Sequence, residues 1–345
     1  MQTRHLDIDK SGRNGAGSGT QALSNRVALL LAGGDGMRLR DLTSEISGIP
    51  IPKQYCRLIQ RASLLEAAIS RAHLLIPLKR INVVINENHV DLAKDQVVFL
   101  PPSNIFVQPL NRDTGPGLVF ALLALERVYK DAIVAVFPTD HYVDNNWAFI
   151  AHVMRAINTI SYMPEKIALL GIVPDGPETG YGYILPANPL KTSGNLYHVD
   201  SFMEKPNSDD AREIIERGGL WNTLVMVFRL SRMLELVQEI APREAEGLFE
   251  LRTSPEKAAS LYQAMQPWNF STKLLVRIPQ HLVVLKVANV FWSDWGTREA
   301  IERTYRALNL VPSWKLEKAT GNRISKFGEG QDDLLNRVPQ SVDRH

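Results

Sequence analysis

The feature that most constrains the fold is a glycine-rich loop directly after a short apolar run. Residues 27–31 contain no polar side chain, which predicts a buried strand of a parallel sheet. The loop then reads LAGGDGMRLR, with glycines at Gly33, Gly34 and Gly36. Glycine permits tight turns and a close approach of the backbone to a ligand, and backbone amides exposed in such turns bind anions. The segment therefore predicts a phosphate-binding loop, with an ordinary strand-to-helix turn as the alternative.

Two arginines follow these glycines. Arg38 and Arg40 place positive charge where a polyphosphate would lie, and a guanidinium binds phosphate oxygens through two parallel hydrogen bonds. The loop lacks the Gly-Lys-Ser/Thr ending of a P-loop. It also fails the GxGxxG spacing, because Arg38 and Leu39 stand where the last glycine is required. Both of these familiar nucleotide-binding motifs are excluded here.

Strands and helices are expected to alternate along the first half of the chain. Ser63 and Glu66 have the spacing of a helix capping box. Apolar runs predict further strands at 81–85, 104–107, 131–137 and 167–172, and helices are expected at 63–75, 89–99 and 116–129. This alternation predicts an α/β fold with right-handed crossovers and a mixed, mostly parallel sheet with helices on both faces. Bent, partly antiparallel strands, and then helices from 231 to 266, are expected afterwards.

The composition indicates a globular protein whose ends differ from its centre. A chain of 345 residues with 45% hydrophobic residues can bury a sizeable core. Residues 1–25 are polar and rich in glycine and serine, so we expect a disordered arm. Residues 311–345 are expected to be a partly disordered tail. Between them we expect one domain, 26–310, made of a first half, 26–165, and a second ligand lobe, 166–310.

Charge and cysteine content limit the partners. The net charge of +2 comes from interspersed acidic and basic residues, so no basic field predicts binding to nucleic acid. No apolar run approaches the roughly 20 residues of a membrane span. Cys56 is the only cysteine and cannot form an internal disulfide, which fits a cytoplasmic location. We expect small-molecule partners, no membrane, and leave a homodimer open.

Two aspartates follow buried strands, at the edge where open α/β sheets bind ligands. Asp140 lies in FPTDH and Asp294 in FWSDWGT. Mg²⁺ prefers one or two carboxylates together with phosphate oxygens, so this pair could hold it. For each aspartate alone, a turn or helix-capping role is the alternative. The histidines, His141 included, lack the spacing of a zinc site.

Taken together, the motifs resemble the sugar-1-phosphate nucleotidyltransferases, and among them most closely the mannose-1-phosphate guanylyltransferases. The segments occur in the same order as in that family, over about Val27 to Arg306: LAGGDGMRL, IPKQ, QPLNRDTGPG, FPTDH, PETGYGYI, FMEKP, LWNT and WSDWG. The family usually has Thr, Asn and Gly where this chain has Met37, Asp113 and Leu224. The resemblance implies a Rossmann-like, GT-A-like domain whose first half binds nucleotide and whose second half binds sugar phosphate.

The resemblance also implies roles for individual residues. The implied nucleotide-binding residues are Leu31, Ala32, Gly33, Gly34, Gly36, Asp113, Thr114, Pro138 and Asp140. The implied sugar-binding residues are Gly182, Glu204, Lys205 and Asn222. Asp140 and Asp294 would hold Mg²⁺. The implied catalytic residues are Arg38, Lys53 and Lys205.

The implied reaction is attack by an oxygen of a sugar-1-phosphate on the α-phosphorus of a nucleoside triphosphate. Its products are a nucleotide sugar and pyrophosphate, and the best-matching substrates are mannose-1-phosphate and GTP, which give GDP-mannose. Glucose-1-phosphate with UTP or dTTP is an alternative. A regulatory protein that binds a nucleotide sugar with weak catalysis is another, suggested by Met37, Asp113 and Leu224.

Overall fold

The computed structural model describes residues 25–58, 62–190 and 194–312. The expected N-terminal arm, apart from Asn25, and the expected tail beyond residue 312 lie outside the described residues. The chain divides into two units, one ending at Ile301 and one beginning at Glu302. The sheets and the site described below belong to the first unit.

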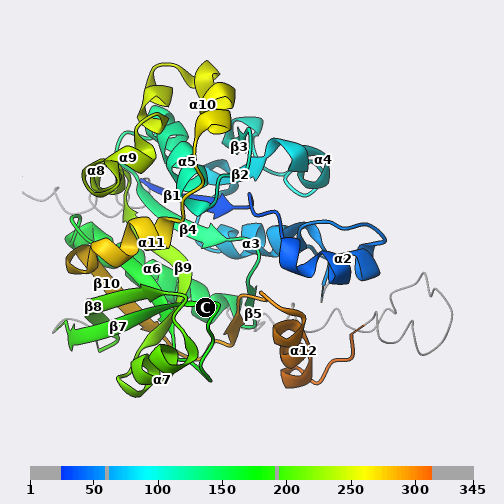
Figure 1. Ribbon diagram of the computed structural model, residues 1–345, viewed down its shortest axis with the longest axis vertical. Coiled ribbons are helices and arrows are strands. Elements are labelled where there is room, and N and C mark those ends of the chain that lie inside the picture. The colour runs from blue at the N-terminus through cyan, green and yellow to red at the C-terminus, as the bar shows by residue number, and fades with distance from the viewer. Residues whose placement is uncertain (1–24, 59–61, 191–193, 313–345) are drawn as a thin grey trace, which may run out of the picture. The chain divides into compact units, whose positions relative to one another are not determined.

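A nine-stranded mixed sheet forms the centre of this unit (Figure 1). The strand order is β3-β2-β1-β4-β9-β6-β10-β8-β7. The strands are β1 (Arg26–Leu31), β2 (Ile81–Asn86), β3 (Ile105–Gln108), β4 (Ile133–Pro138), β6 (Ile167–Ile172), β7 (Gly182–Pro189), β8 (Leu196–Glu204), β9 (Leu220–Arg229) and β10 (Leu282–Val287). β3, β2, β1 and β4 are mutually parallel, whereas β9 and β8 run against their neighbours. This confirms the expected mixed sheet.

Helices cover both faces of the sheet, as expected. Val27 and Leu29 belong to a core with α5 (Thr114–Val128) and α8 (Leu230–Ile240). Because side chains alternate along a strand, Ala28 and Leu30 point to the opposite face. On that face α3 (Leu64–His73) and α6 (Asn146–Tyr162) pack together. The remaining helices are α2 (Arg40–Ser47), α4 (Val90–Ala93), α7 (Ser208–Glu216), α9 (Pro242–Ala245), α10 (Ala258–Ala264), α11 (Phe270–Lys273) and α12 (Arg298–Ala307).

The predicted local signals have mixed outcomes. The capping box is confirmed, because the Ser63 hydroxyl accepts from the Glu66 amide and the Glu66 carboxylate accepts from the Ser63 amide. The helix expected at 89–99 is wrong in length, since α4 ends at Ala93. From Lys94 to Leu100 the chain forms turns instead, in which the Gln96 amide donates to the Ala93 carbonyl and the Leu100 amide donates to the Val97 carbonyl. The helices expected from 231 to 266 are confirmed as several short segments, and Pro242 and Pro255 each begin a new one.

A small second sheet joins two distant parts of the chain. β5 (Tyr142–Val143) pairs antiparallel with β11 (Trp292–Ser293), with Ser293 opposite Tyr142. Asp140 lies shortly before β5, and Asp294 directly follows β11. The pairing therefore brings the two predicted metal-binding segments together. Among the described residues, no helix combines the length and apolar character needed to cross a bilayer.

Candidate functional site

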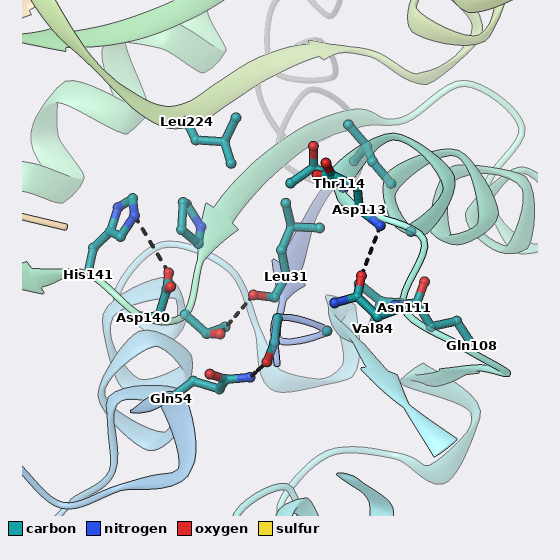
Figure 2. A pocket seen from close by; sticks show the side chains of 16 residues that line it. Leu31, Gln54, Val84, Gln108, Asn111, Asp113, Thr114, Asp140, His141 and Leu224 are labelled. Atoms are coloured by element: carbon teal, nitrogen blue, oxygen red, sulfur yellow. Dashed lines mark hydrogen bonds and ion pairs between the residues drawn. The ribbon is translucent and has the colours of Figure 1, made fainter. Parts of the chain in front are cut away.

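A cavity of about 470 Å³ lies at the carboxyl ends of β1 and β4. Figure 2 shows the side chains that line it, from strand ends, from the glycine loop and from the start of α5. Seven residues of the predicted nucleotide-binding set line it: Leu31, Gly33, Gly34, Asp113, Thr114, Pro138 and Asp140. Ala32 and Gly36, from the same set, are not among the lining residues. The cavity thus lies where parallel sheets bind ligands.

The glycine loop has its carbonyls bound and its amides available. Gln54 Nε2 donates to the carbonyls of Ala32 at 3.0 Å and of Gly34 at 2.6 Å. The Tyr55 hydroxyl also donates to the Ala32 carbonyl, at 2.9 Å, and Asn86 Nδ2 donates to the Gly33 carbonyl, at 2.7 Å. No amide from Gly33 to Gly36 donates a hydrogen bond to any described residue. A loop held in this way presents preorganised donors to an anion.

Gly36 is the loop position where glycine is required. Its φ of +59° lies in the left-handed region, and a Cβ there would stand 2.9 Å from Pro52 Cα and 3.0 Å from Lys53 N. Any side chain would therefore meet backbone as well as strain its own conformation. The same proximity places the Pro52-Lys53 pair directly against the loop.

Sequence reasoning missed Asp35 and the side chains that hold the loop. Asp35 Oδ1 accepts from Asn86 Nδ2 at 3.2 Å, and Oδ2 accepts from Asn111 Nδ2 at 2.8 Å. His89 Nε2 lies 3.5 Å from the same carboxylate. The aspartate therefore connects the loop to the segments after β2 and β3. Gln54, by contrast, directly follows the Pro52-Lys53 pair. Its position next to this motif could have indicated that it lies at the site.

Lys53 is buried between the two aspartate segments. Its Nζ lies 3.2 Å from Asp140 Oδ2, donates to the Trp295 carbonyl at 3.0 Å and also donates to the Asp294 carbonyl. Its side chain is only 8% exposed. A buried ammonium at this point offers positive charge at the edge of the cavity, next to Asp140.

The surroundings of Asp140 favour its ionised form. Burial alone would raise its pKa, but Lys53 and the neighbouring His141 outweigh burial and hold the pKa below its ordinary value. His141 Nε2 lies 3.5 Å from Asp140 Oδ1. An ionised carboxylate is the form that binds a hard cation, so its chemistry fits Mg²⁺.

The side chain of Asp294 is oriented by two donors. Oδ1 accepts from the Tyr181 hydroxyl at 2.8 Å and from the Gly296 amide at 2.7 Å. The described part of the chain contains no group of three or more His, Cys, Asp or Glu side chains able to hold a metal. The two aspartates fit Mg²⁺ as a partial set that phosphate oxygens would complete, which is the usual arrangement for this ion.

The four predicted sugar-binding residues form a second cluster. Gly182 on β7 pairs with Glu204 on β8, and Asn222 lies on β9. A Cβ at Gly182 would stand 2.7 Å from Glu204 Oε2 and 3.4 Å from Asn222 Cβ, so glycine leaves space between them. Lys205 Nζ lies 4.0 Å from Glu204 Oε1. Burial raises the pKa of Glu204, while Lys205 opposes the shift.

The remaining predicted residues occupy different settings. Asp113 has φ +69° and caps α5, because its Oδ1 accepts from the Thr114 amide at 2.6 Å. The Thr114 hydroxyl accepts from the Phe270 amide at 2.9 Å. Arg38 is exposed, and no ion pair joins it to any residue that the structure describes. Asp113 is therefore the N-cap of α5, whereas a turn or capping role was the alternative considered for Asp140 and Asp294.

Comparison with known proteins identifies relatives of this chain. A sequence model described as nucleotidyl transferase matches residues 27–309. The xanthan biosynthesis protein XanB of Xanthomonas campestris is 33% identical over 228 residues, which are 65% of this chain and 46% of that protein. A mannose-1-phosphate guanylyltransferase of Klebsiella pneumoniae is 32% identical over 222 residues, 63% of this chain and 45% of that protein. The chain thus matches less than half the length of these curated relatives.

A solved structure gives the same result for the fold. A Thermus thermophilus protein, described as a mannose-1-phosphate geranyltransferase, superposes with a TM-score of 0.71 at 26% identity. The match covers 81% of this chain and 79% of that one.

Proposed function

Because the chain belongs to the nucleotidyl transferase family, we propose that it transfers a nucleotidyl group from a nucleoside triphosphate to a sugar-1-phosphate. The observation that carries this proposal is the glycine loop, whose carbonyls are bound by Gln54, Tyr55 and Asn86 while its amides are left for an anion. Gly33, Gly34 and Asp140 line the cavity, and Lys53 Nζ lies 3.2 Å from Asp140 Oδ2.

In this proposal an oxygen of the sugar phosphate forms a bond to the α-phosphorus, and the bond to the β-phosphate oxygen breaks. Pyrophosphate leaves with that electron pair. The attacking phosphate is already largely anionic at neutral pH, because its second pKa is about 6, so no general base is needed. The residues therefore have to hold two mutually repelling anions in line and balance the charge that develops.

Each residue then has a defined task. Arg38 and Lys53 bind the β- and γ-phosphates and stabilise the departing pyrophosphate, and the loop amides add donors to the same oxygens. Lys205 binds the sugar phosphate, and Glu204 and Asn222 bind sugar hydroxyls. Asp140 and Asp294 would hold Mg²⁺, which when bound supplies charge neutralisation at the α-phosphate.

The substrates we propose are mannose-1-phosphate and GTP. Support comes from the relatives named as mannose-1-phosphate guanylyltransferases and from the order of the motifs. At about 32% identity these relatives indicate the reaction class more strongly than the sugar or the base.

The test measures pyrophosphate release from GTP, ATP, UTP and dTTP, each with mannose-1-phosphate and with glucose-1-phosphate, with and without Mg²⁺. We expect the highest catalytic efficiency with GTP and mannose-1-phosphate. Highest efficiency with UTP or dTTP and glucose-1-phosphate would replace the substrates but keep the reaction. Nucleotide binding without turnover for every pair would support the regulatory alternative and overturn the enzymatic proposal.

A further inference from the structure

Strand β9 contains a bulge beside the cavity. Leu169 of β6 faces Met226, and Gly171 faces Asn222, so one residue of β6 lies opposite the three residues from Thr223 to Val225. Extra residues in one strand bend it and re-aim a side chain. The bulge therefore interrupts an otherwise regular ladder at one point.

Side chains of the bulge itself satisfy the backbone that it frees. The Thr223 hydroxyl donates to the Leu170 carbonyl at 2.8 Å and accepts from the Val225 amide at 3.2 Å. Asn222 Oδ1 accepts from the Leu224 amide at 3.1 Å. The side chains of Asn222 and Thr223 thus hold the bulge in this conformation through specific hydrogen bonds.

Leu224 has an unfavourable backbone conformation at the tip of the bulge. Its φ is +56°, in the left-handed region where glycine is normally found and where a Cβ approaches the following carbonyl. Strain of this kind persists where the surrounding structure holds it in place, and it is concentrated at ligand sites. Leu224 lines the cavity, and Figure 2 shows it on the side of the pocket opposite Gln54.

Leu224 also lies at the boundary between the cavity and the sugar cluster. Its amide is bonded to Asn222 of that cluster, yet Asn222 does not line the cavity and Leu224 does. On its other side β9 pairs with β4, whose Val136 faces Met226, so the bulge is next to the strand end that leads to Asp140. Under the proposed function, the α-phosphate and the sugar phosphate meet at this boundary.

We propose that Leu224 selects the acceptor by size, admitting sugar-1-phosphates with a hydroxyl at C2 and excluding those with an acylated amine there. This rests on the proposed function. In a sugar-1-phosphate, C2 adjoins the carbon that bears the phosphate, so its substituent is among the ring groups nearest to the reacting phosphates. An apolar branched side chain at that boundary would occupy space beside C2 that an N-acetyl group needs, and it offers no hydrogen-bond partner for the amide of that group.

The test compares the sugar-1-phosphate that the wild type uses best, which we expect to be mannose-1-phosphate, with its counterpart that differs only by an acetamido group at C2, in the presence of the nucleotide that the wild type uses best. The variants are Leu224→Gly and Leu224→Ala, and Leu234→Ala, a buried α8 residue that does not line the cavity, is the control. We expect the wild type to prefer the unsubstituted sugar by about 10- to 200-fold in kcat/KM. Leu224→Gly should reduce this ratio at least tenfold, and the control should leave it unchanged.

A second measurement tests the conformation independently of activity. Glycine normally destabilises a protein relative to alanine, but at a positive φ the order reverses. We therefore expect Leu224→Gly to melt about 1–3 °C above Leu224→Ala. The opposite order would overturn the strained conformation on which the proposal rests.

The outcomes separate this inference from the proposed function. If the wild type turns over sugar phosphates and Leu224→Gly leaves the kcat/KM ratio of the two sugars unchanged, the selection by Leu224 is wrong and the proposed function stands. A wild type that releases no pyrophosphate from any pair would overturn the proposed function. In that case the two sugar phosphates are compared by the rise in melting temperature that each produces, and equal rises in the wild type would overturn the selection as well.

Discussion

Replacing Lys53 by methionine should reduce both stability and turnover, because its ammonium has structural partners as well as a proposed substrate role. Methionine keeps the unbranched side chain but removes the donor to the carbonyls of Asp294 and Trp295. A buried carbonyl left without its donor costs about 1–3 kcal/mol. The ion pair with the partly exposed Asp140 adds at most about 1 kcal/mol after solvent screening. The buried Trp295 carbonyl accounts for about 1–3 kcal/mol and the part-buried Asp294 carbonyl for about 1 kcal/mol, so with the ion pair the total is about 2–5 kcal/mol.

This cost converts into a measurable change in melting temperature. At roughly 2 cal/mol/K of unfolding entropy per residue, a domain of this size has about 0.6 kcal/mol/K, so the variant should melt about 3–8 °C below the wild type. Losing an electrostatic group that acts on the departing pyrophosphate should lower kcat by about 10²- to 10³-fold. Thermal unfolding followed by circular dichroism and steady-state pyrophosphate release measure the two effects.

Lys205→Met is the matched control. Lys205 is 56% exposed, and methionine retains its Cβ, so the strain of its φ of +50° is unchanged. We expect a melting temperature within about 1 °C of the wild type and a KM for the sugar phosphate raised about 10- to 100-fold, with less effect on kcat. If Lys53→Met melts like the wild type, or if the two variants share one kinetic defect, the separate roles assigned to these lysines are wrong.

Three further predictions concern carboxylates. Asp140→Ala and Asp294→Ala should each abolish Mg²⁺-dependent pyrophosphate release and retain the circular dichroism spectrum, and full activity in both would contradict the metal assignment. Burial raises the pKa of Glu204, so the stabilisation from its protonated form is complete below the unfolded pKa of about 4.3 and is lost as pH rises through the folded pKa. Glu204→Gln should therefore melt above the wild type at pH 8, with a smaller difference at pH 4, while the KM for sugar phosphate rises; a lower melting temperature at pH 8 would refute this. GTP should exceed ATP by at least about tenfold in kcat/KM. Asp113→Asn retains a helix-capping side chain, so it tests whether Asp113 contacts the base. A reduced preference for GTP would support that contact, and an unchanged preference would exclude it.

The parts of the fold that were predictable from the sequence depend on local chemistry. The uninterrupted apolar run before the glycine loop requires a buried strand, and the Ser63-Glu66 spacing places a helix start because the two residues cap each other. The location of the site at the carboxyl ends of the strands then follows from the parallel order of β1 and β4.

What was not predictable depends on pairing over long distances. Lys53 is bound by carbonyls more than 240 residues away, and these arrive there because β11 pairs with β5. Neither two-residue strand has a periodic signal of its own. The Gly33 carbonyl is likewise bound by Asn86, which is 53 residues away and has no local signal that links it to the glycine loop.

The strained residues of the site show why local rules fail there. Six non-glycine residues of the described chain have positive φ, and four of them are at the site or touch it: Asp113, Lys205, Leu224 and Trp295. Their intrinsic preferences oppose these conformations, so sequence propensity points away from them. Each is held by a contact that the fold supplies, such as the Trp295 carbonyl bound by Lys53 and the Leu224 amide bound by Asn222. Local preference is therefore overridden at the candidate site by contacts that the fold supplies, and these positions are the ones where substitution should alter function most specifically.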